Sequence, residues 1–115
     1  MGLPARLTDL DKDEMERLVV NATEAAQFLK AFSHEGRLLI LCHLATGEKS
    51  VTELEQLLHA RQAAVSQQLA RLRLEGLVNA RRDGKTIWYS LADDRAMRIL
   101  ELVYEMFCNP DQPAV

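Results

Sequence analysis

Residues 63–91, AAVSQQLARLRLEGLVNARRDGKTIWYSL, decide the fold of this chain. The first half spaces its apolar residues as a helix does: Val65, Leu69 and Leu72. Gly76 follows as a typical helix stop. Asp83-Gly84 then predicts a tight hairpin turn, because Asp-Gly tolerates the positive φ angles that such turns need. The stretch therefore predicts a helix over residues 62–76, followed by two short antiparallel strands.

Three further helices are predicted upstream of this stretch. The first runs from about Asp11 to Phe32, with Thr8 or Asp9 as its cap. The second covers residues 34–46, is capped by Ser33 and ends at Gly47. Its centre is apolar on nearly all sides, which is typical of a buried helix.

A short third helix, TELEQLL, opens with Ser50-Val-Thr-Glu53, which has the spacing of a capping box. It ends at a break over residues 59–61. After the hairpin, Ala92 or Asp93 leads a last helix that runs to about residue 108. Two short helices joined by a tight break and followed by a hairpin predict a winged helix-turn-helix, a mainly α fold with a β-hairpin wing in the order α-α-α-α-β-β-α.

Length and composition favour one helix-rich domain. The chain has 115 residues, of which 48% are hydrophobic and 27% charged. We expect residues 9–108 to form the domain and residues 1–8 and 109–115 to form flexible tails. No run approaches the ~20 apolar residues of a membrane helix, and the start lacks the apolar region of a secretory signal. These features predict a cytoplasmic protein with no membrane partner.

Positive charge is concentrated in the deciding stretch, although the whole chain has a net charge of −3. Residues 60–85 carry six basic and two acidic residues, a net charge of +4, whereas the remainder carries 8 basic and 15 acidic residues, or −7. A basic patch on an acidic body is typical of a surface that binds a phosphate backbone, although a solvated basic surface would give the same count.

The outer face of the 62–76 helix is predicted to read DNA. If its apolar stripe faces the core, small and polar residues without a carboxylate face outward. The candidate DNA-binding residues on this helix are Gln62, Ala63, Ser66, Gln67, Gln68 and Arg71. Gln67 can bond an adenine edge with two hydrogen bonds, whereas Arg71 lies a turn further on and suits a phosphate.

Arg81, Arg82 and Lys85 bracket the predicted wing turn and are the candidate phosphate contacts of the wing. One domain has one recognition helix, so tight binding predicts a homodimer on two half-sites of operator DNA. The first and last helices are the candidate dimerisation elements. A protein-interaction module is the alternative of another class. We expect no enzyme and no cofactor, because the chain has no phosphate loop, paired carboxylates or nucleophile motif.

Three segments together resemble the ArsR family of bacterial winged-helix repressors: FSHEGRLLIL at the second helix, SQQLARLRLEGLV at the recognition helix and DGKTIWYSL at the wing. The resemblance covers roughly residues 20–107. It implies a dimer that leaves operator DNA when an inducer binds. The family's arsenic-sensing cysteine cluster is absent from VTELEQLL, and the last helix has no histidine for its zinc site. No metal site is therefore predicted.

The two cysteines, Cys42 and Cys108, remain as candidate sensors. Their spacing alone is also compatible with two inert core thiols, because free cysteines are often buried. Their placement, in LLILCHLA and YEMFC, resembles that of the persulfide- and sulfide-responsive branch of the family. The resemblance implies that they join through a disulfide or a polysulfide bridge, which lifts repression. Peroxide or a thiol-bound metal ion stays open as another inducer.

Overall fold

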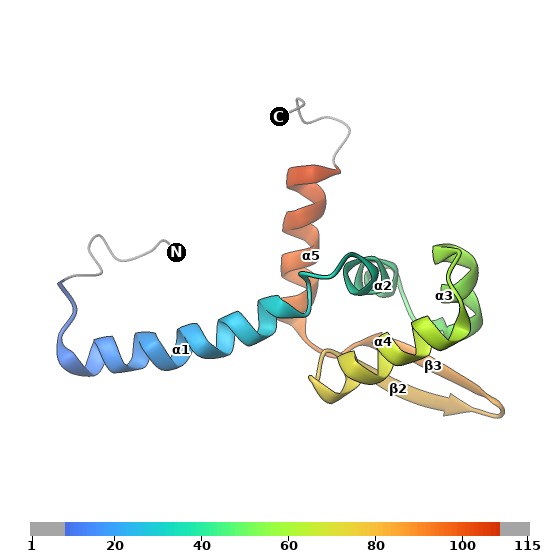
Figure 1. Cartoon of the computed structure of the whole chain (residues 1–115), viewed down its shortest axis with the longest axis horizontal. Coiled ribbons are helices and arrows are strands. Elements are labelled where there is room, and N and C mark those ends of the chain that lie inside the picture. The colour runs from blue at the N-terminus through green and yellow to red at the C-terminus, as the bar shows by residue number, and fades with distance from the viewer. Residues whose placement is uncertain (1–8, 109–115) are drawn as a thin grey trace.

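The computed structural model describes residues 9–108, which form five helices and three strands (Figure 1). In chain order these are α1 (Lys12–Lys30), α2 (Glu35–Ala45), β1 (Lys49–Ser50), α3 (Val51–Leu58), α4 (Gln62–Leu74), β2 (Val78–Asp83), β3 (Thr86–Leu91) and α5 (Asp94–Phe107). The predicted order of helices and hairpin is confirmed, with β1 as an addition. The two predicted tails, residues 1–8 and 109–115, lie outside the described residues.

The cap of α1 differs from the prediction. Asp11 is the N-cap, and its carboxylate accepts a hydrogen bond of 2.8 Å from the backbone N–H of Glu14. Asp9 lies too early, and Thr8 is not among the described residues. The N–H groups in the first turn of a helix have no partner within the helix. Asp11 satisfies one of them, and this fixes the start of α1 at Lys12.

The cap of α2 also differs, because His34 takes the place predicted for Ser33. The Nδ1 atom of His34 accepts hydrogen bonds from the N–H groups of Gly36 and Arg37. The Ser33 hydroxyl instead donates back to the carbonyl of Lys30 at 2.7 Å, so it belongs to the end of α1. A neutral imidazole nitrogen accepts as a carboxylate or hydroxyl oxygen does, although histidine is not among the preferred caps.

A single hydrophobic core lies between α2, α3, α4, the hairpin and the start of α5. Its fully buried side chains include Ile40, Leu41, Leu54, Val65, Leu69 and Leu72. The capping box of α3 is present as predicted: the Ser50 hydroxyl accepts from the N–H of Glu53, whose carboxylate accepts from the N–H of Ser50. His59 ends α3 in the left-handed region, with φ of 52°. This sharp stop lets α4 turn across α3.

The wing is a three-stranded antiparallel sheet in the order β1-β3-β2. β2 and β3 pair along their whole length, from Val78 opposite Leu91 to Asp83 opposite Thr86. Gly84 has φ of 63° at the turn, as the Asp-Gly signal predicted. The strand β1 was not predicted, because its two residues are also the entry to the capping box of α3.

Two helices extend away from this core (Figure 1). α1 projects to one side and no residue within it is buried, whereas α5 leaves at a steep angle from the end of β3. Asp93 caps α5, as one of the two predicted leaders. Within residues 9–108, no helix is long and apolar enough to cross a membrane.

Candidate DNA interface and dithiol site

α4 presents the outward face that its sequence predicted. Val65, Leu69 and Leu72 are at most 2% exposed and hold the helix against the core. The candidate reading residues split into two groups: Gln62, Ala63, Gln67 and Arg71 are exposed, and Ser66 and Gln68 are half-buried. The exposed group therefore has the freer access to a base edge or a phosphate, and Gln67 stands at its centre.

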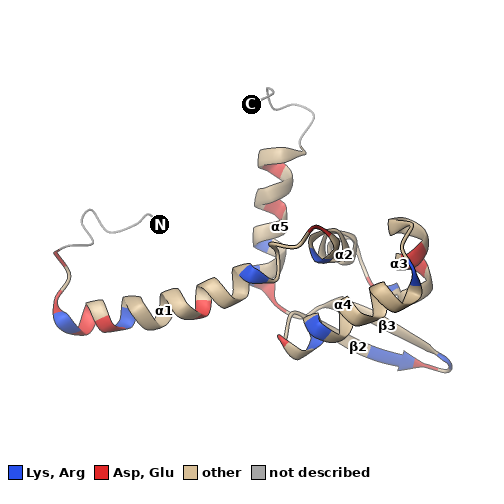
Figure 2. Ribbon diagram, viewed as in Figure 1, with Lys and Arg blue, Asp and Glu red and all other residues tan. Residues whose placement is uncertain are grey.

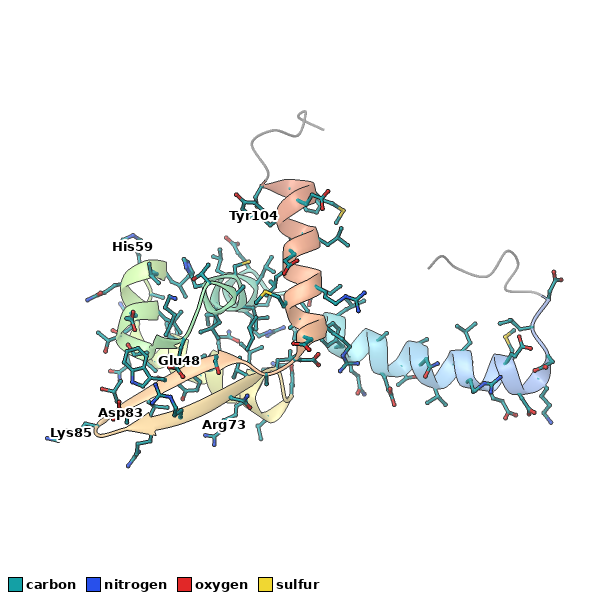
Figure 3. The ribbon with its side chains drawn as sticks, turned by 180° about the vertical axis from the view of Figure 1, so that it is seen from behind. Glu48, His59, Arg73, Asp83, Lys85 and Tyr104 are labelled. Carbon is teal, nitrogen blue, oxygen red and sulfur yellow. The ribbon has the colours of Figure 1, made fainter. Side chains whose placement is uncertain are left out.

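Lysine and arginine residues are concentrated on the hairpin and on the last turn of α4, whereas the outer part of α5 carries acidic residues (Figure 2). Arg82 and Lys85 are exposed, and Lys85 stands at the tip of the wing (Figure 3). Both side chains are therefore accessible from solvent. Arg71 makes an ion pair of 3.3 Å with Glu75, one turn further along α4, and stays 57% exposed.

Arg81 differs from its neighbours because it is held by Glu48, in the loop between α2 and β1. The Arg81 Nε and Nη2 atoms donate to the two carboxylate oxygens of Glu48 at 3.1 and 2.7 Å. These hydrogen bonds lower the pKa of the Glu48 carboxyl and raise the pKa of the Arg81 guanidinium. A fork-to-fork contact of this kind fixes geometry, although exposed pairs add little stability. No sequence pattern indicated this contact, because Glu48 lies 33 residues from Arg81 in the chain.

The two cysteines lie on α2 and at the C-terminal end of α5. Cys42 is half-buried on α2, Cys108 is exposed at the C-cap of α5, and both are free thiols. Burial raises the pKa of the Cys42 thiol, and the charge of a Cys108 thiolate raises that pKa further. The Cys42 thiol is therefore harder to ionise than that of an unperturbed cysteine.

A pocket of about 370 Å³ lies beside Cys42, between α2 and α5. Its walls are Cys42 and Ala45 from α2, Thr46 at the C-cap of α2, and Met97, Leu100, Glu101 and Tyr104 from α5. Met97, Glu101 and Tyr104 recur at helical spacing, and Cys108 continues that row, with its N–H bonded to the Tyr104 carbonyl at 2.8 Å. The row therefore points Cys108 toward the side of α5 that faces α2.

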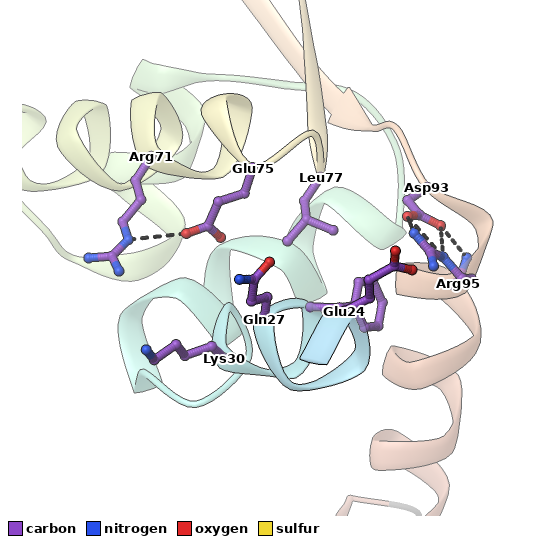
Figure 4. Close-up of a pocket in the computed structure, with 9 residues that line it drawn as sticks. Glu24, Gln27, Lys30, Arg71, Glu75, Leu77, Asp93 and Arg95 are labelled. Atoms are coloured by element: carbon purple, nitrogen blue, oxygen red, sulfur yellow. Dashed lines mark hydrogen bonds and ion pairs between the residues drawn. The ribbon is translucent and has the colours of Figure 1, made fainter. Parts of the chain in front are cut away.

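A second pocket, of about 420 Å³, lies where the end of α1 meets the ends of α4 and β3 (Figure 4). Its walls carry both signs of charge, including Glu24, Arg71 and Arg95. Arg95 lies over the Phe28 ring at 5.0 Å and pairs with Asp93 at 2.8 Å, which lowers the pKa of the Asp93 carboxyl. These contacts tie α5 to α1, and sequence patterns did not indicate them.

The three histidines do not gather. His34 and His59 stand at helix ends, and His43 is half-buried on α2. Among residues 9–108 there is no group of three or more histidine, cysteine, aspartate or glutamate side chains placed to hold a metal ion. The candidate sites of this part of the chain are therefore the α4 and wing surface and the dithiol.

The fold and its basic surface define a winged helix-turn-helix regulator of transcription. The family model "Bacterial regulatory protein, arsR family" matches residues 34–80, which run from the α2 cap into β2. The chain is 44% identical over 104 residues to the biofilm growth-associated repressor of Agrobacterium fabrum, covering 90% of this chain and 89% of that protein. The chain belongs to the ArsR family, and it is a DNA-binding transcriptional regulator.

Solved structures agree with this assignment. Reduced HlyU from Vibrio cholerae superposes with a TM-score of 0.79 at 39% identity, covering 82% of this chain and 99% of that chain. Its sequence is named a transcriptional activator. The "homodimeric winged helix-turn-helix DNA-binding domain" Mb0332 from Mycobacterium bovis superposes with a TM-score of 0.69 at 28% identity, covering 87% of this chain and 89% of that chain. The sequence-based resemblance to the ArsR family is therefore confirmed.

Proposed function

We propose that this protein is a homodimeric, cytoplasmic repressor that binds operator DNA and is released by reactive sulfur species acting on Cys42 and Cys108. The recognition helix is α4, with Gln67 at the centre of its exposed face, and the wing contributes Arg82 and Lys85. Similarity to a protein named a repressor and to a domain described as homodimeric supports this proposal. The observation that carries it is the pocket beside Cys42, whose α5 wall of Met97, Glu101 and Tyr104 continues at helical spacing to Cys108.

Cys108 is the first nucleophile in the proposed reaction. It is exposed, whereas Cys42 is half-buried with a raised pKa and so is less often a thiolate at neutral pH. The Cys108 thiolate attacks the outer sulfur of a persulfide RSSH. A sulfur–sulfur bond forms at Cys108, the bond inside the donor breaks, and the thiol RSH leaves. The Cys42 thiolate then attacks the Cys108 sulfur and expels hydrosulfide.

This sequence needs no other oxidant, because one RSSH and two thiols give one disulfide, RSH and H₂S. A second RSSH inserts one more sulfur and gives a trisulfide with two RSH and one H₂S. A simple disulfide needs Cα atoms within about 7 Å, whereas a bridge with extra sulfurs spans more. The same site can therefore close with a direct or a longer bridge.

Bridging would act on DNA binding through the helix that carries Cys42. α2 packs against α4 in the core through Ile40 and Leu41, whereas the outer part of α5 carries exposed apolar residues suited to a dimer interface. A crosslink between α2 and α5 fixes the DNA-reading unit relative to the dimer helices. A coupling free energy of about 1–3 kcal/mol is enough to change operator affinity 5- to 150-fold.

Intact-protein mass spectrometry tests the proposal when it is combined with fluorescence anisotropy on operator DNA. Reduced protein is exposed in parallel to a persulfide and to hydrogen peroxide. The expected result with the persulfide is loss of two alkylatable thiols together with release of DNA. Cys42→Ser and Cys108→Ser should bind DNA when reduced and fail to release it. A cysteine variant that stays fully inducible would overturn the dithiol mechanism.

Two other inducers remain as outcomes of the same experiment. Bridge formation with peroxide alone would make the protein a peroxide sensor, and release by a metal ion without bridging would make the thiols metal ligands. Because one relative is named a repressor and another an activator, a promoter–reporter assay decides the direction of regulation. Absence of a salt-sensitive DNA complex would favour the protein-interaction module.

A further inference from the structure

The pocket beside Cys42 has an apolar lining with a single charged wall residue. Ala45, Met97 and Leu100 are among its apolar wall residues, and Glu101 brings a carboxylate from the exposed side of α5. Its volume of about 370 Å³ exceeds what a water molecule or two would need. The pocket therefore has room for a small organic group.

We propose that this pocket binds the sulfur donor and selects donors whose organic substituent is uncharged, with Glu101 as the residue that disfavours anionic ones. The inference rests on the proposed function, because it assigns the donor class of the same dithiol. The substituent lies between α2 and α5, and the outer sulfur of the donor points to Cys108, one turn beyond Tyr104. Cys42 in the opposite wall is then placed to complete the bridge.

Two physical effects act in the same direction on a donor with a carboxylate. Moving an ionised carboxylate from water to an apolar wall is costly unless the protein supplies a partner, and the pocket wall offers no cation. Glu101 adds repulsion between like charges at the rim. An uncharged substituent meets neither cost and gains from contact with Ala45 and Met97.

A matched pair of donors tests the charge selectivity. The persulfides of N-acetylcysteamine and N-acetylcysteine differ by one carboxylate, so ionisation of the persulfide group itself largely cancels between them. Rates of thiol loss are measured on the whole reduced protein by quenched alkylation and intact mass. We expect the uncharged donor to react faster by about two- to fivefold at low salt, and the ratio to shrink as ionic strength rises.

Variants separate the pocket from general charge. Glu101→Gln should accelerate the reaction of the anionic donor. The rate ratio of the uncharged to the anionic donor should therefore decrease. Glu105→Gln removes a carboxylate one turn further along α5 that is not in the pocket wall, so it should leave the ratio unchanged. Ala45→Leu fills the pocket and should slow both donors, while DNA binding of the reduced protein is retained. Thermal denaturation checks that each variant is folded.

The outcomes distinguish the two proposals. If neither donor modifies the thiols, the sulfur-sensing function itself fails. Two results would refute the selective pocket and leave the sulfur-sensing function intact. In one, both donors form the bridge at equal rates. In the other, Glu105→Gln lowers the rate ratio of the two donors as much as Glu101→Gln does.

Discussion

Arg81 and Glu48 join the wing to the loop that follows α2 through two hydrogen bonds of 3.1 and 2.7 Å. The contact turns one of the three basic wing residues toward its own protein. Arg81 lies on β2, and Glu48 directly precedes β1, which pairs with β3. The contact therefore links the two outer strands of the sheet. Arg81 is therefore placed to fix the tilt of the wing.

This relationship predicts unequal effects of the wing arginines on DNA binding. Arg82→Ala should weaken binding to all sequences and lower the salt slope by about 0.9, as expected for one lost phosphate contact. Arg81→Ala should lower the slope by less, because Glu48 already neutralises that guanidinium. The measurement is anisotropy titration at several KCl concentrations. Equal slopes for the two variants would show that Arg81 leaves Glu48 when DNA binds.

Glu48→Gln complements that comparison. Removal of the carboxylate frees Arg81 for a phosphate, so the salt slope should steepen by up to about 0.9 if the wing keeps its position. The native pair also has a pH dependence. The pKa of the Glu48 carboxyl is lowered, so the contact is complete at neutral pH and is lost as the pH falls through the folded-state pKa of Glu48. The salt slopes of DNA binding of the wild-type protein and of Glu48→Gln should therefore become equal at acidic pH.

The two thiols should differ in reactivity before any bridge forms. Exposed Cys108 should react first with iodoacetamide, and Cys42 more slowly, because it is half-buried and its pKa is raised by burial and by the neighbouring Cys108 thiolate. The alkylation rate of an unperturbed cysteine stops rising once the pH exceeds its pKa. The alkylation rate of Cys42 should keep rising to a higher pH. Cys108→Ser removes the neighbouring charge and should lower that pH. Peptide mass spectrometry of timed samples measures both rates.

Arg37 should contribute strongly to stability, although its residue type suggested a surface position. It is 8% exposed, and its Nε and Nη2 atoms donate to the carbonyls of Ala31 and Lys30 at 3.1 and 3.0 Å. These carbonyls belong to the end of α1, which has no further turn to bond them. The Lys30 carbonyl also accepts from Ser33, so Arg37→Ala leaves the Ala31 carbonyl without its partner and should cost about 1–3 kcal/mol in urea denaturation.

Arg73→Ala is the matched control for Arg37, because Arg73 is exposed on α4. Its effect on the free energy of unfolding should stay within about 0.5 kcal/mol. Similar losses for the two variants would show that the buried contact of Arg37 adds nothing beyond the removal of a long side chain.

Local signals predicted most of the fold. The spacing of Val65, Leu69 and Leu72, the capping box at Ser50 and the Asp-Gly turn are each determined within a few residues, and all three are present. The helix caps were harder to predict, because several acceptors stand near each start. Ser33 and His34 are adjacent, and which of them caps depends on where the last turn of α1 ends.

Contacts between distant segments could not be read from the sequence. Glu48 and Arg81 are far apart in the chain, and Arg37 stands in an apolar helix without a pattern that marks it. That Cys42 and Cys108 act as a pair was implied only by the resemblance, since their separation depends on the angle between α2 and α5. The sequence analysis did not identify the row of Met97, Glu101, Tyr104 and Cys108, because nothing in the sequence showed that α2 lies opposite this side of α5.

Gln67 should determine sequence preference more than affinity for DNA in general. It is exposed at the centre of the outward face of α4, and a glutamine that bonds a base edge with two hydrogen bonds discriminates by about 1–3 kcal/mol. Gln67→Ala should therefore weaken operator binding by about 10- to 100-fold and leave binding to unrelated DNA unchanged. Anisotropy titrations on both DNAs at one salt concentration provide the comparison. Equal losses on both would assign Gln67 to the backbone.

Exposed apolar residues on α5 should hold the proposed dimer. Leu102 and Met106 are each 49% exposed, lie one turn apart and face away from the pocket row. Exposed residues of α1, such as Val19 at 62%, add to the apolar surface that a monomer would leave in water. Leu102→Glu with Met106→Glu places two carboxylates in that surface and should shift the protein to a monomer in sedimentation velocity.

Glu105→Gln provides the control for this double variant, because it changes an already polar position on α5 and should leave the dimer intact. The monomer should also lose affinity for an operator with two half-sites far more than for one half-site, because two linked recognition helices bind jointly. If the double variant stays a dimer, the interface excludes this face of α5. The apolar residues of α1 would then be the next positions to change.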